Sequence, residues 1–260
     1  MTITGFTLAV PSPEEAEARA RALFGERAAR RLRFAPVARA HAALRPPRVV
    51  DAGCNHMCVR VADIDAASRF LARQPGVVVL GSALTVPDGA LAGFRWQYFR
   101  MPWGGFFEVQ QWAPSPRDPR ADGLAAQEGL DETAAIPTVV GFDHAGFAVT
   151  DLERAVTAFE AIGGKHVLGS VGAADRAVML GQFELDATDT LRMAMVRVGD
   201  VNFELFQHDV VELAGEPQRR RPPGPHEPGG CVTHLDTAVP DDVAAELREL
   251  GVAVAGGDRA

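Results

Sequence analysis

The sequence predicts an α+β fold built from repeated β-α-β-β-β modules. Two observations carry this prediction. In three segments, a histidine opens a short β-prone run, a valine follows five residues later, and an aspartate seven residues after the histidine begins a helix. These segments run from Asn55 to Asp63, from Asp143 to Asp151 and from Thr233 to Asp241. In addition, two of the units close with the same strand, turn and strand pattern of a hairpin.

A fourth, weaker copy of the pattern stands first in the chain. The run Phe6–Ser12 aligns with the other copies on Val10, and Gly5 stands where they have histidine. The segment Ser12–Glu15 then supplies an N-cap, a first-turn proline and a capping-box glutamate, which together favour a helix start. Residues 1–45 are therefore predicted to form a partial β-α module.

The two middle units have every element of a module. Asp63 and Asp151 are natural N-caps, and apolar residues follow each of them at helical spacing. The strands of the two predicted hairpins are residues 96–101, 106–112, 193–198 and 201–207. Complete β-α-β-β-β modules are thus expected over residues 46–113 and 139–209.

Linkers separate these modules from each other and from the last unit. Residues 114–138 and 210–229 are rich in proline and other turn-forming residues. The third copy of the histidine pattern then opens a partial β-α-β module over residues 230–260, which ends before any fourth strand.

Composition limits the classes of function. The 260 residues carry 26 basic and 34 acidic side chains, a formal charge of -8, and no apolar run near the length that crosses a bilayer. The three cysteines have no CxxC spacing, which is typical of reduced thiols. Residues 1–5 show no basic leader or cleavage site. We therefore expect a cytoplasmic protein that binds a small molecule, with no nucleic-acid or membrane partner.

Three short motifs extend the pattern: Gly-Phe-Asp-His at 141–144, Asn-Phe-Glu-Leu-Phe-Gln at 202–207 and Pro-Trp-Gly-Gly at 102–105. With the repeats, they resemble the vicinal oxygen chelate superfamily, which includes glyoxalase I, methylmalonyl-CoA epimerase, extradiol dioxygenases and bleomycin-binding proteins. The resemblance implies that two β-α-β-β-β modules pair into a curved mixed sheet around a cleft. It covers most of the chain and is strongest in the two complete modules.

The resemblance also implies a metal site. In this superfamily the first strand of each module supplies a metal-binding histidine and the fourth strand a metal-binding glutamate. Carried onto this sequence, those positions are His56 and Glu108 in one module, and His144 and Glu204 in the next.

The chemistry of these four side chains favours particular metals and reactions. Imidazole nitrogen and carboxylate oxygen suit Zn, Ni, Fe or Mn better than Ca or Mg. A divalent ion acts as a Lewis acid on substrate oxygens. Glu204 or Glu108 then takes a proton from the carbon next to the metal-bound oxygen, as general base. The leading hypothesis is a metal-dependent lyase or isomerase of glyoxalase type that acts on a small oxygenated organic substrate.

Strand alternation predicts which other side chains line the cleft. Arg60 shares the face of His56 and is the candidate partner of a substrate carboxylate. His208 shares the face of Glu204. The other candidate substrate-binding residues are Phe106, Gln110, Asn202 and Phe206.

His234 leaves a second arrangement open. If the modules pair in sequence order, His144, Glu204 and His234 meet, a set typical of Fe(II) oxygenases, and the runner-up function is an Fe(II)-dependent extradiol-type dioxygenase. If the two complete modules pair, which we prefer, His234 is a bystander and the partial units cover sheet edges. A metal-free drug- or metabolite-binding (resistance) protein is the alternative from another class. A homodimer whose two chains share the site is also left open.

Overall fold

The computed structural model describes residues 1–44, 47–113, 129–210, 213 and 221–257. Residues 114–128 of the first predicted linker, most of 211–220 in the second, and residues 258–260 of the last predicted unit lie outside the described residues.

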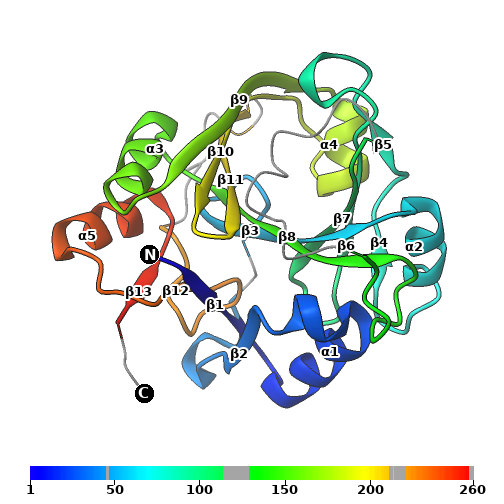
Figure 1. Ribbon diagram of the computed structural model, residues 1–260, viewed down its shortest axis with the longest axis horizontal. Coiled ribbons are helices and arrows are strands. Elements are labelled where there is room, and N and C mark those ends of the chain that lie inside the picture. The colour runs from blue at the N-terminus through cyan, green and yellow to red at the C-terminus, as the bar shows by residue number, and fades with distance from the viewer. Residues whose placement is uncertain (45–46, 114–128, 211–212, 214–220, 258–260) are drawn as a thin grey trace.

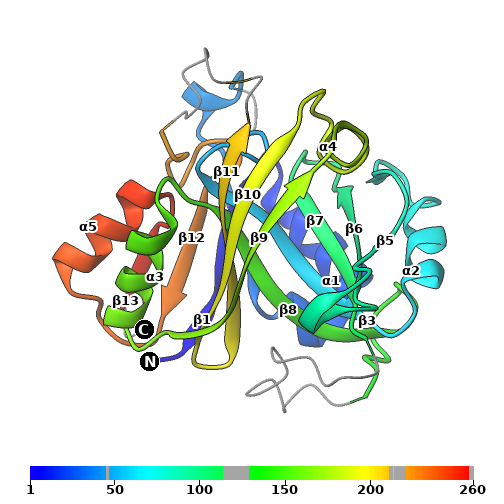
Figure 2. The same cartoon turned by 90° about the horizontal axis from the view of Figure 1, so that it is seen from above.

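The described strands form two sheets (Figures 1 and 2). The large sheet has nine strands in the order β4-β6-β7-β3-β8-β11-β10-β9, with β5 paired to β6, and the small sheet has the order β13-β12-β1-β2. The strands of the large sheet are β3 (Gly53–Val61), β4 (Val78–Val79), β5 (Leu84–Thr85), β6 (Arg95–Arg100), β7 (Phe106–Gln111), β8 (Val139–Ala148), β9 (Lys165–Ala174), β10 (Asp189–Val198) and β11 (Val201–Val210). Those of the small sheet are β1 (Ile3–Val10), β2 (Leu32–Pro36), β12 (Cys231–Leu235) and β13 (Val254–Gly256).

Two helices begin at aspartates that the sequence marks as N-caps, whereas the expected cap at Ser12 forms no side-chain hydrogen bond and Pro240, not Asp241, is the N-cap of the last helix. Asp63 and Asp151 accept hydrogen bonds from the backbone N–H groups of Ala66 and Arg154, as expected of N-caps. The α-helices are α1 (Pro13–Ala29), α2 (Ile64–Leu71), α3 (Leu152–Ala161), α4 (Arg176–Phe183) and α5 (Asp241–Leu250), and short 3₁₀ turns span Arg39–His41 and Gly89–Leu91. Within the described ranges, no helix has the length and apolar character needed to span a membrane.

The two complete modules pair through their first strands. β3 runs antiparallel to β8, β7 runs parallel to β3, and β11 runs parallel to β8. The two predicted hairpins are present as β6–β7 and β10–β11. Four adjacent strands at the centre of one mixed sheet thus come from the two modules, which confirms the predicted paired-module fold.

The two partial units do not cover the edges of the large sheet. Instead, β1 pairs antiparallel with β12, so that Phe6 lies opposite Thr233, and β2 and β13 extend this pair on either side. The first and last units therefore build the small sheet together. The expectation that they protect edges was wrong, because their apolar faces are instead buried against the large sheet.

Aromatic rings fill the space between the two sheets. Phe6 lies 5.5 Å from Phe142 and 5.9 Å from Phe203, and Phe24 of α1 stacks on Phe107 at 5.2 Å between ring centroids. Phe107 and Phe203 alternate along their strands with the two glutamates predicted to bind metal. The small sheet and α1 therefore cover one face of the large sheet and leave the candidate ligands on the other, which we call the site face.

Helix α1 is interrupted at Gly25, whose φ of 76° and ψ of 171° are not helical. Beyond it, the N–H of Glu26 donates to Thr133 Oγ1 and the N–H of Arg27 to Asp131 Oδ2, each at 2.8 Å. A Cβ at position 25 would lie 2.6 Å from Asp131 Oδ2. A distant segment therefore caps the second half of α1, and glycine makes room for it.

Replacing Asp131 with alanine should lower the free energy of unfolding by about 1–2 kcal/mol, the usual contribution of such a cap. Burial opposes ionisation of Asp131, but hydrogen bonds from Thr133 and Arg27 outweigh it and lower its pKa. The cap therefore stabilises the fold above the unfolded-state pKa of about 4, and this stability is lost as the pH falls through the lower folded pKa. Urea titrations of both proteins should converge under acid conditions; a pH-independent difference would contradict this account.

Candidate metal centre

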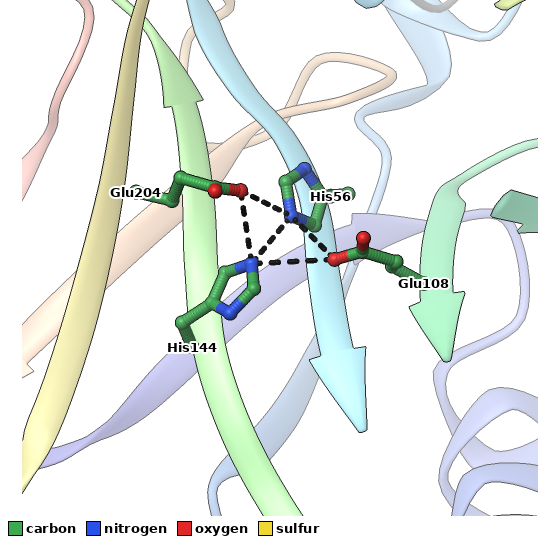
Figure 3. A group of neighbouring side chains, drawn as sticks. All are labelled: His56, Glu108, His144 and Glu204. Atoms are coloured by element: carbon green, nitrogen blue, oxygen red, sulfur yellow. Dashed lines mark hydrogen bonds and ion pairs between the residues drawn. The ribbon is translucent and has the colours of Figure 1, made fainter. Parts of the chain in front are cut away.

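The structure brings together the four side chains that the resemblance singles out (Figure 3). The Nε2 atoms of His56 and His144 lie 2.8 Å apart. Glu108 Oε2 is 3.4 Å from each of them, and Glu204 Oε2 is 3.5 Å from His56 and 3.2 Å from His144. All four residues are buried. Because β7, β3, β8 and β11 are neighbours, residues far apart in sequence converge at one point.

The residues before the two histidines fix the orientation of the imidazole rings. Asp143 Oδ1 lies 2.9 Å from His144 Nδ1, and Asn55 Oδ1 lies 2.8 Å from His56 Nδ1. A carboxylate can only accept, so His144 Nδ1 carries the proton. The amide of Asn55 donates to the backbone oxygen of Val49, which leaves its oxygen to accept from His56. Both Nε2 lone pairs therefore point at the two carboxylates.

Two imidazole nitrogens and two carboxylate oxygens that face one buried point attract positive charge, which is a proton on a ring nitrogen or a bound metal ion. Burial opposes ionisation of Glu108, but hydrogen bonds with His144 and His56 outweigh it and lower its pKa. Burial likewise opposes protonation of His144, yet Cys58, Glu204 and Asp143 raise its pKa well above the ordinary value. The cluster thus attracts positive charge, and its nitrogen and oxygen donors fit a divalent transition metal.

A glycine that sequence reasoning missed allows this convergence. Gly146 lies opposite His56 in the β3–β8 register. A Cβ at position 146 would lie 2.0 Å from Cε1 of the His56 ring, far inside van der Waals contact. Its signal in the sequence is a glycine two residues after the second histidine, inside a strand where glycine is otherwise unfavourable.

Replacing Gly146 with alanine should displace the His56 ring and weaken metal affinity at least tenfold, a loss typical of disturbed ligand orientation. A zinc titration with a competing chelator would measure it. Gly172→Ala is the matched control, because a Cβ there meets Leu191 at an ordinary 3.8 Å. Equal affinities in the two variants would contradict the role of Gly146.

The predicted substrate residues fall into two groups. Gln110 donates to Glu108 Oε2 at 2.9 Å, and the Phe206 ring lies 6.3 Å from that of His56. The ring of Phe106 lies 6.5 Å from that of Tyr98, whose hydroxyl group contacts His56. Asn202 and Arg60 contact other partners: Asn202 Oδ1 accepts from Arg197, and the Arg60 guanidinium stacks on Trp112 at 4.0 Å.

His234 does not join the four. It lies on β12 of the small sheet, where its Nε2 is 2.7 Å from Thr7 Oγ1. The pairing of modules in sequence order, which would unite it with His144 and Glu204, is therefore not the observed one.

Tyr98 and helix α4 form a further layer over the site face. The Tyr98 hydroxyl lies 3.1 Å from His56 Nδ1; burial, together with Glu108 and Glu204, raises its pKa, so it stays protonated. Phe183 of α4 packs on the Tyr98 ring at 5.1 Å, and Gln182 accepts from the Tyr98 N–H. The sequence did not predict that Tyr98 or α4 would lie next to the site. Through these contacts α4, which belongs to the second module, packs on the first module.

Comparisons with known proteins agree with the fold described above. No family model matches the chain. A solved glyoxalase I (V278E mutant) from Zea mays superposes with a TM-score of 0.51 and 13% identity, over 96% of this chain and 80% of that one. A putative dioxygenase from Bacillus subtilis superposes with a TM-score of 0.50 and 12% identity, over 95% of this chain and 73% of that one. This chain has the vicinal oxygen chelate fold.

One curated protein shares a closer local similarity. A 63-residue segment is 53% identical to a 2-epi-5-epi-valiolone epimerase from Actinomyces sp.. The segment covers 24% of this chain and 34% of the epimerase, so the match spans about a third of that protein's length.

Proposed function

We propose that this protein is a metal-dependent isomerase of the epimerase type, which moves a proton at a carbon next to the carbonyl group of a small polyhydroxylated cyclic ketone. The observation that carries the proposal is the buried convergence of His56, Glu108, His144 and Glu204. The local similarity to a 2-epi-5-epi-valiolone epimerase supports the choice of reaction and substrate class. It narrows the broader expectation of a glyoxalase-type lyase or isomerase.

The four side chains would hold a divalent ion such as Zn, Ni, Fe or Mn. When bound, such an ion supplies Lewis acidity, which makes the carbon next to a carbonyl group easier to deprotonate. The protein would keep the site dry, because all four residues are buried, and this strengthens every electrostatic interaction there.

The two carboxylates differ in how firmly they are held. Gln110 donates to Glu108 Oε2, and the Glu108 side chain is only 4% exposed. The Glu204 side chain is 12% exposed. Glu204 is therefore the better candidate for the group that reaches the substrate and removes its proton.

The positions of the two acids also suit inversion of a carbon centre. Glu108 and Glu204 flank the histidine pair from opposite sides (Figure 3). Glu204 can take a proton from one face of the substrate, and a solvent proton delivered to the opposite face, on the side of Glu108, would invert the carbon centre. Glu204 then releases its proton to solvent. The net reaction changes configuration only, with no oxidation and no loss of atoms.

Proton exchange tests the proposed reaction directly. The zinc-loaded protein should catalyse incorporation of deuterium from D₂O next to the carbonyl group of 2-epi-5-epi-valiolone, together with formation of an epimer, both followed by proton NMR. Epimer and deuterium should appear at comparable rates. A substrate that keeps its proton and configuration in the presence of zinc-loaded protein would contradict the proposal.

Metal removal should change both composition and stability. We expect purified protein to hold one divalent ion per chain, since one cluster of four donors is present in the described part of the chain. Dialysis against a chelator should lower the melting temperature, because the ion binds only the folded state. Zinc or manganese should restore it and calcium should not. A protein that carries no metal and shows no shift would favour the metal-free binding alternative.

A further inference from the structure

A second buried pair of ionisable groups lies on the neighbouring strands β10 and β11. His208 Nδ1 is 2.6 Å from Asp189 Oδ2, and Asp189 Oδ1 accepts the backbone N–H of Asp209 at 2.8 Å. The side chains of His208 and Asp189 are 7% and 0% exposed. Because the carboxylate can only accept, Nδ1 carries the proton, and Nε2 keeps its lone pair in the neutral ring.

The other ring nitrogen lacks a protein partner. His208 Nε2 is buried, and no described residue forms a hydrogen bond with it. Two apolar residues are its neighbours: Leu191 lies opposite it in the β10–β11 register, and Phe206 stacks on it at 5.6 Å between ring centroids. A buried acceptor without a partner costs about 1–3 kcal/mol, so this nitrogen has the capacity to accept from a donor outside the chain, such as a water molecule or a ligand hydroxyl group.

The position of His208 relates this nitrogen to the metal centre. His208 and Glu204 are four residues apart on β11, so they share the site face. Their Cα atoms are about 13 Å apart along an extended strand. Phe206 lies between them, with its ring 6.3 Å from His56 and 5.6 Å from His208. On the site face, the Phe206 ring therefore lies between the cluster of four and His208.

We propose that His208, oriented by Asp189, accepts a hydrogen bond from a substrate hydroxyl group remote from the reacting carbon. The proposal rests on the proposed function, because it assumes that the reacting carbon lies at the metal centre. A polyhydroxylated ring has the matching chemistry, since its C–H face can pack on Phe206 and its hydroxyl groups can donate at the edge. A carboxylate or phosphate ester fits worse, because it would face a lone pair backed by the buried Asp189.

Two variants of His208 test this contact. His208→Phe keeps a stacking ring without Nε2, and His208→Gln keeps a polar group near the Nε2 position. Calorimetric titration of zinc-loaded protein with 2-epi-5-epi-valiolone should show about 10–100-fold weaker binding for His208→Phe and a loss within about threefold for His208→Gln. Zinc affinity should stay unchanged in both. Wild-type affinity in His208→Phe would overturn the contact.

An NMR measurement on the wild-type protein keeps the test independent of whether the variants fold. In ¹⁵N-histidine-labelled wild type, the Nε2 resonance of His208 should move when the ketone is added; an unmoved resonance at saturation would overturn the proposal. If the ketone binds in a His208-dependent way but exchanges no proton, the contact stands and the proposed reaction fails. If His208→Phe exchanges the proton with an unchanged KM, the proposed reaction stands and the contact with His208 fails. A chain that binds no ketone contradicts both the reaction and the contact.

Discussion

Replacing Glu204 with glutamine should lower the rate of proton exchange about 10²–10⁴-fold, the usual contribution of a general base, while the chain stays folded. The amide keeps the size of the side chain and can still offer an oxygen, but it cannot take a proton. Exchange in D₂O should therefore be measured at saturating zinc, so that weaker metal binding does not hide the loss of the base.

Two comparisons make this result specific to Glu204. Glu249→Gln changes a glutamate whose side chain is 74% exposed on α5, and it should exchange protons at the wild-type rate. Glu108→Gln should weaken zinc binding more than Glu204→Gln does, because Glu108 is the more buried and more firmly held of the two candidate ligands. Wild-type turnover in Glu204→Gln would rule out the proposed mechanism.

Replacing Asp143 with asparagine should weaken metal affinity about 10–100-fold, although Asp143 does not belong to the cluster of four. The carboxylate accepts from His144 Nδ1 at 2.9 Å, and both side chains are completely buried. A negative charge behind the ring makes Nε2 a stronger donor toward the metal, and a neutral amide of the same shape removes that effect. A zinc titration with a competing chelator measures the change.

Asp189→Asn is the matched control for this experiment. Asp189 is also a buried carboxylate that accepts from a histidine Nδ1 on the same sheet, but its histidine stands outside the cluster of four. Its zinc affinity should equal that of the wild type. Equal losses in Asp143→Asn and Asp189→Asn would show a general effect on folding rather than an effect on His144.

Internal repetition made much of the fold predictable. Two modules carry histidine and glutamate at matching positions, so the residue pattern and the resemblance together were enough to name the candidate ligands on the first and last strand of each module. The helix starts at Asp63 and Asp151 were equally readable, since N-capping is a local property of a few residues.

Features that depend on contacts across the molecule could not be predicted in this way. Neighbouring residues on a regular strand point to opposite faces, so Asn55 and Asp143 were not expected to support the histidines beside them. Irregularities in the β3–β8 register, one of them between Cys54 and His56, accompany this departure from alternation. The need for glycine at 146 was hidden for a similar reason, because it depends on a ring from another strand.

The junction of β1 with β12 has a consequence for how the molecule assembles. Its contacts join residues more than 200 positions apart, as in the bond from the Thr2 N–H to Asp236, whereas the four strands around the candidate metal centre lie within residues 53–210. Pairings of such long sequence separation form slowly, since a large loop must close first. During synthesis the four central strands of the large sheet would thus be available early, and the pairing of β1 with β12 would form last.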